Sequence, residues 1–139
     1  MRLSAIVSTC NSSFFLKGCL NNLTKQSLYL TNNLEIIVVD SGSDENEKEI
    51  VHSFQKKYDK IKYLRTSKRE SLYQAWNRGI KASTGEYLTN ANTDDRHDVR
   101  CLERLVNRLE QNLRRDITYG NLFKSMIPNE AFDQNDQSQ

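Results

Sequence analysis

Short apolar runs alternate with longer amphipathic segments along this chain. The runs at 3–8 (LSAIVS) and 34–39 (LEIIVV) are the clearest, and the second is β-branched and almost continuously apolar. Such composition is typical of strands that are covered on both faces. Shorter runs at 61–65, 86–89 and 117–119 predict three more strands.

The segments between these runs carry apolar residues at helical spacing. Serines at 12–13 can cap the first helix, the second begins near Asp44, and the third ends at 83–85. The fourth and longest helix is predicted over 99–113. Strand and helix thus alternate four times before a last strand, which predicts an α/β fold with a mainly parallel sheet and helices on both of its faces.

Length and composition favour one domain. The chain has 139 residues, with one proline and five glycines, so no flexible linker interrupts its body. We expect residues 1–123 to form the domain. Residues 124–139, which end in a polar stretch, are expected to form a disordered tail.

Charge, cysteine content and hydropathy narrow the class of function. Twenty basic and 18 acidic residues give a net charge of +2, which is too balanced for general binding to nucleic acid. The three cysteines lack the spacing of a metal site and favour reduced thiols. No signal peptide opens the chain, and no apolar run approaches the ~20 residues of a membrane span. We therefore expect a soluble cytoplasmic protein without a transmembrane segment.

Three polar loops follow the first, second and fourth predicted strands. They cover 9–11, 40–43 and 90–95, at the sheet edge where open α/β folds bind ligands. The carboxylate of Asp40 only accepts hydrogen bonds, so it suits a ligand with an N–H group, such as a uracil or thymine imide. The alternative is that Asp40 organises an Asx turn before Gly42.

The third loop ends in the adjacent carboxylates of Asp94 and Asp95. Two such groups are hard oxygen ligands for Mg²⁺ or Mn²⁺, and an ion held there could bridge a diphosphate. The alternative is that both cap the following helix. Arg69 is a second candidate for a diphosphate contact, or else a solvated surface residue. A receiver domain shares this alternation of elements but needs an acidic pair at 8–11, where this chain has Ser-Thr-Cys-Asn.

Three segments in order carry a family resemblance: AIVSTCN (5–11), EIIVVDSGSDE (35–45) and AWNRGIKASTGEYLTNANTDDR (75–96). They resemble the family 2 glycosyltransferases, which share the GT-A fold and use nucleotide-diphosphate sugars. The resemblance covers about residues 3–120. It implies a Rossmann-like αβα sandwich with a mainly parallel central sheet.

The resemblance also implies a role for each loop. The first lies near the nucleoside, the second contacts the base, and the third is the metal loop, a variant of the Asp-x-Asp motif with Asn92 in place of the first aspartate. An amide is a weaker metal ligand and suits a sugar or ribose hydroxyl, so the Mn²⁺ or Mg²⁺ ion depends on Asp94 and Asp95. The expected donor nucleotide site consists of Thr9, Asn11, Asp40, Arg69, Asn92 and Asp94.

The implied reaction is metal-assisted, inverting transfer of a sugar from a UDP- or dTDP-type donor to a hydroxyl of a saccharide or lipid-linked acceptor. Such enzymes continue into an acceptor-binding half with a general base, and we find no credible base here. We therefore expect a chain truncated before that half; the alternative is a non-catalytic sugar-nucleotide-binding module that needs a partner chain. Arginines every fourth residue over 96–108 form a solvated face or contact the inner membrane face. The oligomeric state stays open, with a homo-oligomer among the alternatives.

Overall fold

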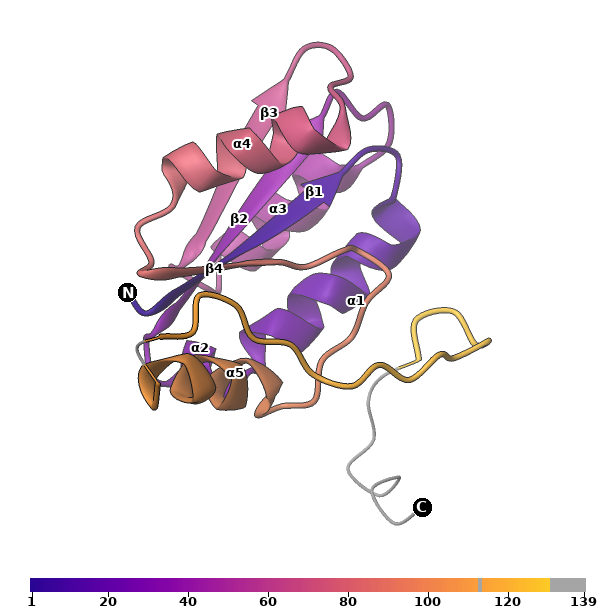
Figure 1. Cartoon of the computed structure of the whole chain (residues 1–139). Coiled ribbons are helices and arrows are strands. Elements are labelled where there is room, and N and C mark those ends of the chain that lie inside the picture. Colours follow the sequence, from indigo (N-terminus) through magenta and orange to yellow (C-terminus); the bar gives the residue numbers. More distant parts are fainter. Residues whose placement is uncertain (113, 131–139) are drawn as a thin grey trace.

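A four-stranded parallel sheet with helices on both faces forms the protein (Figure 1). The computed structural model describes residues 1–112 and 114–130. The strand order in the sheet is β3-β2-β1-β4. The elements are β1 (Leu3–Thr9), α1 (Ser13–Thr24), α2 (Ser27–Leu30), β2 (Leu34–Ser41), α3 (Glu47–Gln55), β3 (Ile61–Thr66), α4 (Leu72–Ala82), β4 (Tyr87–Asn90) and α5 (Cys101–Glu110).

The two central strands divide their side chains between two apolar layers. Alternate residues of β2, such as Ile36 and Val38, pack into the larger layer with α1, α2, α3 and α5. The intervening Ile37 and Val39 pack with Ala75 of α4 on the other face, where α4 is the covering helix among the described residues (Figure 1). Each fully buried aliphatic side chain contributes about 1.5–3 kcal/mol. The predicted parallel sandwich is therefore confirmed, and the continuous apolar character of β2 follows from burial on both faces.

Helix α4 lies very close to the sheet. A Cβ atom on Gly79 would lie 2.4 Å from Cγ2 of Ile6, so only glycine permits this approach. The helix begins with a capping box, in which the Ser71 hydroxyl accepts from the backbone N–H of Gln74 and the Gln74 side chain accepts from the backbone N–H of Ser71. Both features fix α4 against β1 and β2.

A buried carboxylate ties the start of the sheet to the turn after α4. Glu35 on β2 accepts hydrogen bonds from the Ser4 hydroxyl (2.6 Å) and from the Thr84 backbone N–H (2.5 Å) and hydroxyl (2.9 Å). It also pairs with Lys62 on β3 at 2.9 Å. Burial on its own raises the pKa of Glu35, but these hydrogen bonds outweigh burial and lower the pKa to about 2. Glu35 therefore stays ionised and holds β1, β2, β3 and the α4–β4 turn together.

Several predicted elements differ from the structure. The fifth strand over 117–119 is wrong, because these residues form no strand and Ile117 and Tyr119 are 82% and 89% exposed. A three-residue segment makes too few ladder hydrogen bonds to offset the entropy of ordering it. The last helix is shorter than predicted, with Leu113 outside the described residues, and the second begins at Glu47 rather than near Asp44. The short helix α2 was not predicted.

The chain after α5 contains no helix or strand in its described part, 111–112 and 114–130. The predicted disordered tail falls partly on residues 131–139, which lie outside the described residues. Among the helices that the structure describes, none has the length and apolarity needed to cross a membrane.

Candidate functional site

The loops after β1, β2 and β4 meet at one edge of the sheet. Strand β1 lies between the other two, with Thr9 beside Asp40 and Ile6 beside Asn90 in the parallel registers. The carboxyl ends of the three strands therefore point to the same side, as Figure 1 shows. This brings together the three loops that the sequence predicts to bind a ligand.

The first two loops are joined by reciprocal hydrogen bonds. The backbone N–H of Asn11 donates to the Ser43 hydroxyl (3.1 Å), and the Asn11 side-chain oxygen accepts from the backbone N–H of Asp44 (2.8 Å). Asn11 has a positive φ of 50°, which asparagine tolerates better than most residues. The backbone N–H of Ser12 donates to Glu47 Oε1 at 2.7 Å. The predicted nucleoside loop is therefore held in one conformation by the base loop.

Asp40 is fully buried beneath the second loop. Its Oδ1 accepts from the backbone N–H of Ser43 (2.9 Å), and its Oδ2 accepts from the Tyr63 hydroxyl (2.5 Å) and from Arg65 Nη1 (3.0 Å). Asp40 thus organises the loop, although its bond reaches Ser43, three residues on, and not Gly42 as an Asx turn requires. Its contact with a base stays a prediction. Burial, followed by the nearby Asp40 carboxylate, raises the pKa of Tyr63 to about 12, so the phenol remains a donor at neutral pH.

Two of the groups that bind Asp40, the Tyr63 hydroxyl and the Arg65 guanidinium, come from β3, and neither contact was predicted from the sequence. Tyr63 and Arg65 stand two residues apart on β3, so their side chains share one face of the sheet. The register pairs Asp40 with Arg65 directly, and Arg65 Nη2 also donates to the carbonyl of Ser43 at 2.7 Å. The two-residue spacing of Tyr63 and Arg65 indicates that their side chains share a face of the sheet. Only the strand order shows that this face lies beside Asp40.

Two side chains at this edge carry buried polar atoms without a hydrogen-bond partner among the described residues. They are the hydroxyl of Thr9 and Oε2 of Glu47. Buried polar groups are nearly always paired, so each atom has capacity for a water or a ligand. Thr9 is a predicted site residue. Glu47 was missed, because an acid in the first turn of a helix is explained by the helix dipole alone.

Gly42 brings a fourth segment to the site. It has a positive φ of 65°, and a Cβ atom there would lie 2.9 Å from the carbonyl carbon of Lys68 and 3.1 Å from the nitrogen of Arg69. The segment after β3 therefore packs on the base loop through backbone atoms. Arg69 is exposed there, as the donor-site prediction requires.

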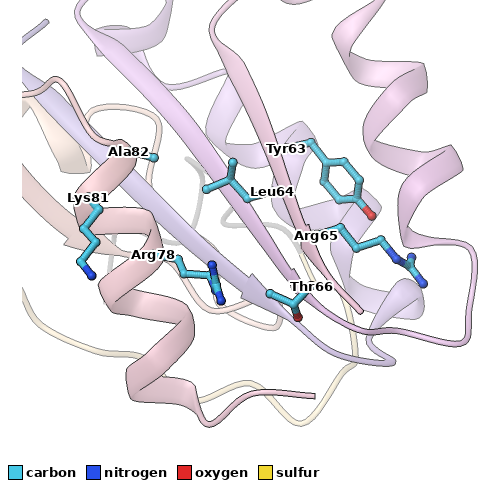
Figure 2. A pocket seen from close by; sticks show the side chains of 7 residues that line it. All are labelled: Tyr63, Leu64, Arg65, Thr66, Arg78, Lys81 and Ala82. Carbon is cyan, nitrogen blue, oxygen red and sulfur yellow. The ribbon is translucent and has the colours of Figure 1, made fainter. Parts of the chain in front are cut away.

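A basic hollow of about 420 Å³ adjoins this segment between the edge strand β3 and α4. Figure 2 shows Arg78 and Lys81 of α4 on one side of β3, with Tyr63 and Arg65 on the other side. Arg78 is already paired with Glu70, at 2.6 Å and 2.7 Å. Its guanidinium therefore stabilises the start of α4. No hydrogen bond joins it, in the described part of the chain, to the segment 91–100 between β4 and α5, which carries Asp94 and Asp95 and which we name the acidic loop.

The third loop presents its two carboxylates to solvent. Asp94 and Asp95 are both exposed. Asp95 Oδ2 accepts from the Asn92 side chain at 2.9 Å, whereas the Asp94 carboxylate makes no hydrogen bond or ion pair within the described part of the chain. The helix-capping alternative is wrong for both residues, because α5 begins at Cys101 with Arg100 at its N-cap.

These carboxylates suit a metal ion that a ligand helps to hold. Within residues 1–112 and 114–130 no group of three or more His, Cys, Asp or Glu side chains is arranged around a common metal position. Mg²⁺ is commonly bound through one or two carboxylates together with substrate phosphates and waters. Asp94 and Asp95 fit that arrangement and do not form a complete metal cage.

Comparisons with known proteins agree with this fold. Residues 4–137 match the sequence profile described as Glycosyl transferase family 2. The chain is 30% identical over 121 residues to glycosyltransferase GlyG of Streptococcus pneumoniae serotype 4, a match covering 87% of this chain and 39% of GlyG. S. aureus TarS 1–349 in complex with UDP-GlcNAc superposes with a TM-score of 0.71 at 25% identity, over 80% of this chain and 32% of that one. The mannosyltransferase PcManGT of Pyrobaculum calidifontis, in complex with GDP-Man and Mn²⁺, gives a TM-score of 0.59 at 26% identity, over 65% of this chain and 27% of that one.

Proposed function

Because this chain belongs to glycosyl transferase family 2, we propose that it provides the nucleotide-sugar site of an enzyme that transfers a sugar to an acceptor hydroxyl. The observation that carries the proposal is the meeting of the Thr9, Asp40 and Asp94–Asp95 loops at one sheet edge. The chain spans 39% of the length of GlyG, so the activity of a whole enzyme is part of the proposal.

The base of the donor binds at the first two loops. Asp40 has two carboxylate oxygens with about four acceptor positions, and three donors occupy it in this structure. An imide N–H reaches Asp40 once Arg65, whose side chain is 38% exposed, swings away from it. The unpaired hydroxyl of Thr9 and the fixed backbone of Asn11 lie next to this position and contact the nucleoside. These contacts favour a uridine- or thymidine-type donor.

The diphosphate binds at the acidic loop with Mn²⁺ or Mg²⁺. Asp94 is the direct ligand, because its carboxylate is exposed and unengaged in the described structure, and Asp95 stands beside it. The ion would neutralise charge on the departing nucleoside diphosphate. Asn92 holds Asp95 through one amide hydrogen, which leaves its other hydrogen for a donor hydroxyl. Arg69 reaches the phosphates from the segment after β3.

The remaining features of the reaction follow from the family. We propose transfer with inversion to a hydroxyl of a saccharide or of a lipid-linked acceptor, at the cytoplasmic side of the membrane. We assign no general base among these residues.

Calorimetric titration of the chain with UDP, dTDP and GDP, each with and without Mn²⁺, tests the proposal. We expect a uracil or thymine nucleotide to bind, with Mn²⁺ tightening the binding. Asp94→Ala should abolish the effect of Mn²⁺, while Asp59→Ala, which removes an exposed carboxylate that pairs with Lys60, should leave it intact. A chain that binds no nucleotide under either condition would sink the proposal. Release of free sugar from a UDP-sugar would distinguish an enzyme from a module that only binds donors.

A further inference from the structure

One face of α1, together with the residue that precedes α2, contacts the acidic loop. The contacting residues are Phe15, Gly18, Cys19, Asn22 and Gln26, which we name the α1 stripe. The four residues within α1 follow the i, i+3, i+4, i+7 pattern of one helix face, and Gln26 lies four residues after the last of them. We propose that the α1 stripe positions the acidic loop for binding of a metal-bound diphosphate, with Asn22 as its main positioning residue. This inference rests on the proposed function of that loop.

Asn22 holds the loop by both ends of its amide. Its Nδ2 donates to the carbonyl of His97 (2.9 Å), and its Oδ1 accepts from the backbone N–H of the same residue (2.8 Å). A two-point contact to the N–H and carbonyl of one residue fixes the orientation of the backbone there as well as its position. Among side chains of this length only asparagine offers a donor and an acceptor in one plane. Alanine removes both bonds, and aspartate keeps only the acceptor.

Gln26 extends the contact toward α5. The residue is fully buried, and its Nε2 donates to the carbonyl of Asp98 at 2.8 Å, while its Oε1 accepts from the backbone N–H of Leu102 at 3.4 Å. The backbone N–H of Ser27 donates to the carbonyl of Val99 at 2.9 Å. The loop is therefore tied to the α1–α2 region before α5 begins.

Arg96 makes the corresponding contact at the other end of the loop. Its Nη1 donates to the carbonyls of Thr93 and Asp95, each at 2.7 Å, and its Nη2 donates to the carbonyl of Phe15 at 3.2 Å. A Cβ atom on Gly18 would lie 2.4 Å from that Nη2, so a larger residue there would force the guanidinium to shift. Arg96 thus bridges helix and loop, and its predicted place on an arginine stripe of the last helix is wrong.

The contacts share a property that suits a binding loop. From residue 92 to residue 98 the stripe and Arg96 bind backbone groups of the loop, including the carbonyl of Asn92, which accepts from the Cys19 thiol at 3.7 Å. None of these bonds uses the carboxylate of Asp94 or Asp95. The loop backbone is therefore fixed while both acidic side chains remain available, which is the role of residues behind a metal ligand.

Three variants compared by calorimetry with UDP, with and without Mn²⁺, test this inference. Asn22→Ala is expected to weaken the Mn²⁺-dependent binding about 10–100-fold, the range typical for residues that support metal ligands. Binding of UDP without Mn²⁺ is expected to stay within about twofold of the wild type, because the base contacts come from other loops. The matched control is Asn21→Ala, which changes an exposed neighbour on α1 and should leave both affinities unchanged.

Gly18→Ala separates positioning from stability. Alanine is the better helix former, so α1 itself is not weakened, yet its methyl group would lie 2.4 Å from Arg96 Nη2 and is expected to shift the guanidinium away from the loop carbonyls. We expect the same selective loss of Mn²⁺-dependent binding, in a protein whose urea unfolding midpoint is close to that of the wild type. If Asn22→Ala does not fold, Gly18→Ala still tests whether the α1 stripe positions the acidic loop.

The outcomes divide clearly. If wild-type protein binds UDP no better with Mn²⁺ than without, the proposed function of the acidic loop fails, and this inference fails with it. If wild-type binding depends on Mn²⁺ but Asn22→Ala and Gly18→Ala bind as tightly as wild type, only the positioning role is overturned. An equal loss of affinity with and without Mn²⁺ also overturns it, since that result reflects general damage to the fold.

Discussion

The buried Glu35 allows a stability prediction whose size follows from the structure. In the substitution Glu35→Gln the shape of the side chain is kept, but its charge and the ion pair with Lys62 are lost. The Ser4 hydroxyl and the Thr84 N–H and hydroxyl all donate to Oε1, and the Lys62 ammonium pairs with Oε2. A glutamine oxygen can keep the first three bonds only by turning its NH2 group toward Lys62, so one acceptor of the carboxylate is replaced by a donor that faces another donor.

The expected magnitude comes from the pKa of Glu35. Its folded value of about 2 lies below the ordinary 4.5, and that difference corresponds to about 3 kcal/mol of stabilisation in the ionised state. The folded pKa is depressed, so the stabilisation is fully present above about pH 5. It is lost progressively as the pH falls toward 2 and the carboxylate takes up a proton.

Urea unfolding followed by circular dichroism at pH 7, 5, 4 and 3 measures this directly. We expect Glu35→Gln to be less stable than the wild type by about 3 kcal/mol at pH 7, with the gap closing as the pH falls. Glu110→Gln removes a partly exposed ion pair with Arg2 and serves as the control, with an expected loss below about 1 kcal/mol. A gap that stays constant from pH 7 to pH 3 would refute the assignment of the stabilisation to the ionised carboxylate.

Two further predictions concern the site and its cysteines. Gly42→Ala should destabilise the protein by about 1–3 kcal/mol in urea unfolding, because the residue has a φ of 65° and its Cβ would lie 2.9 Å from the carbonyl carbon of Lys68. The control is Gly120→Ala, where an added Cβ would have no atom within 4 Å. Equal stability of the two variants would contradict this explanation. Cys19 should resist iodoacetamide at pH 8 while Cys10 reacts, because Cys19 is buried and burial raises the pKa of its thiol to about 12. Peptide mapping of the alkylated protein measures the modification of each cysteine. Alkylation of Cys19 at the same rate as Cys10 would contradict the prediction, since it would mean that the buried face of α1 becomes exposed to solvent.

The central strands were predictable because their composition reflects burial on both faces. The β2 run is apolar at successive positions, a signal that needs no knowledge of its neighbours. The predicted strand over 117–119 has the same local character, yet its side chains remain exposed. A strand of three residues depends on what lies beside it, and the sequence of the segment carries no information about that.

The meeting of the three loops at one sheet edge was predictable, but the contacts of their residues were not. The three loops follow from strand order, and Asp40, Asp94 and Asp95 are recognisable by residue type. The partners of these residues come from distant parts of the chain, such as Tyr63 and Asn22, and depend on strand register and helix packing. Asn22 lies at the edge of an apolar helix face, where an amide is indistinguishable from an ordinary surface residue until the loop opposite is known.

The tethering of the acidic loop has a consequence for the speed of ligand binding. Fixing one residue of a flexible loop costs roughly 1–2 kcal/mol of conformational entropy, and here the hydrogen bonds from Asn22, Gln26 and Arg96 pay that cost during folding. A ligand arriving at this edge meets a loop backbone that is already in place. Association should therefore follow a single exponential whose rate rises linearly with ligand concentration, without the plateau that a slow closing step imposes. The rate at which ligand and protein meet, and not a rearrangement of the acidic loop, is then expected to limit the rate of ligand binding.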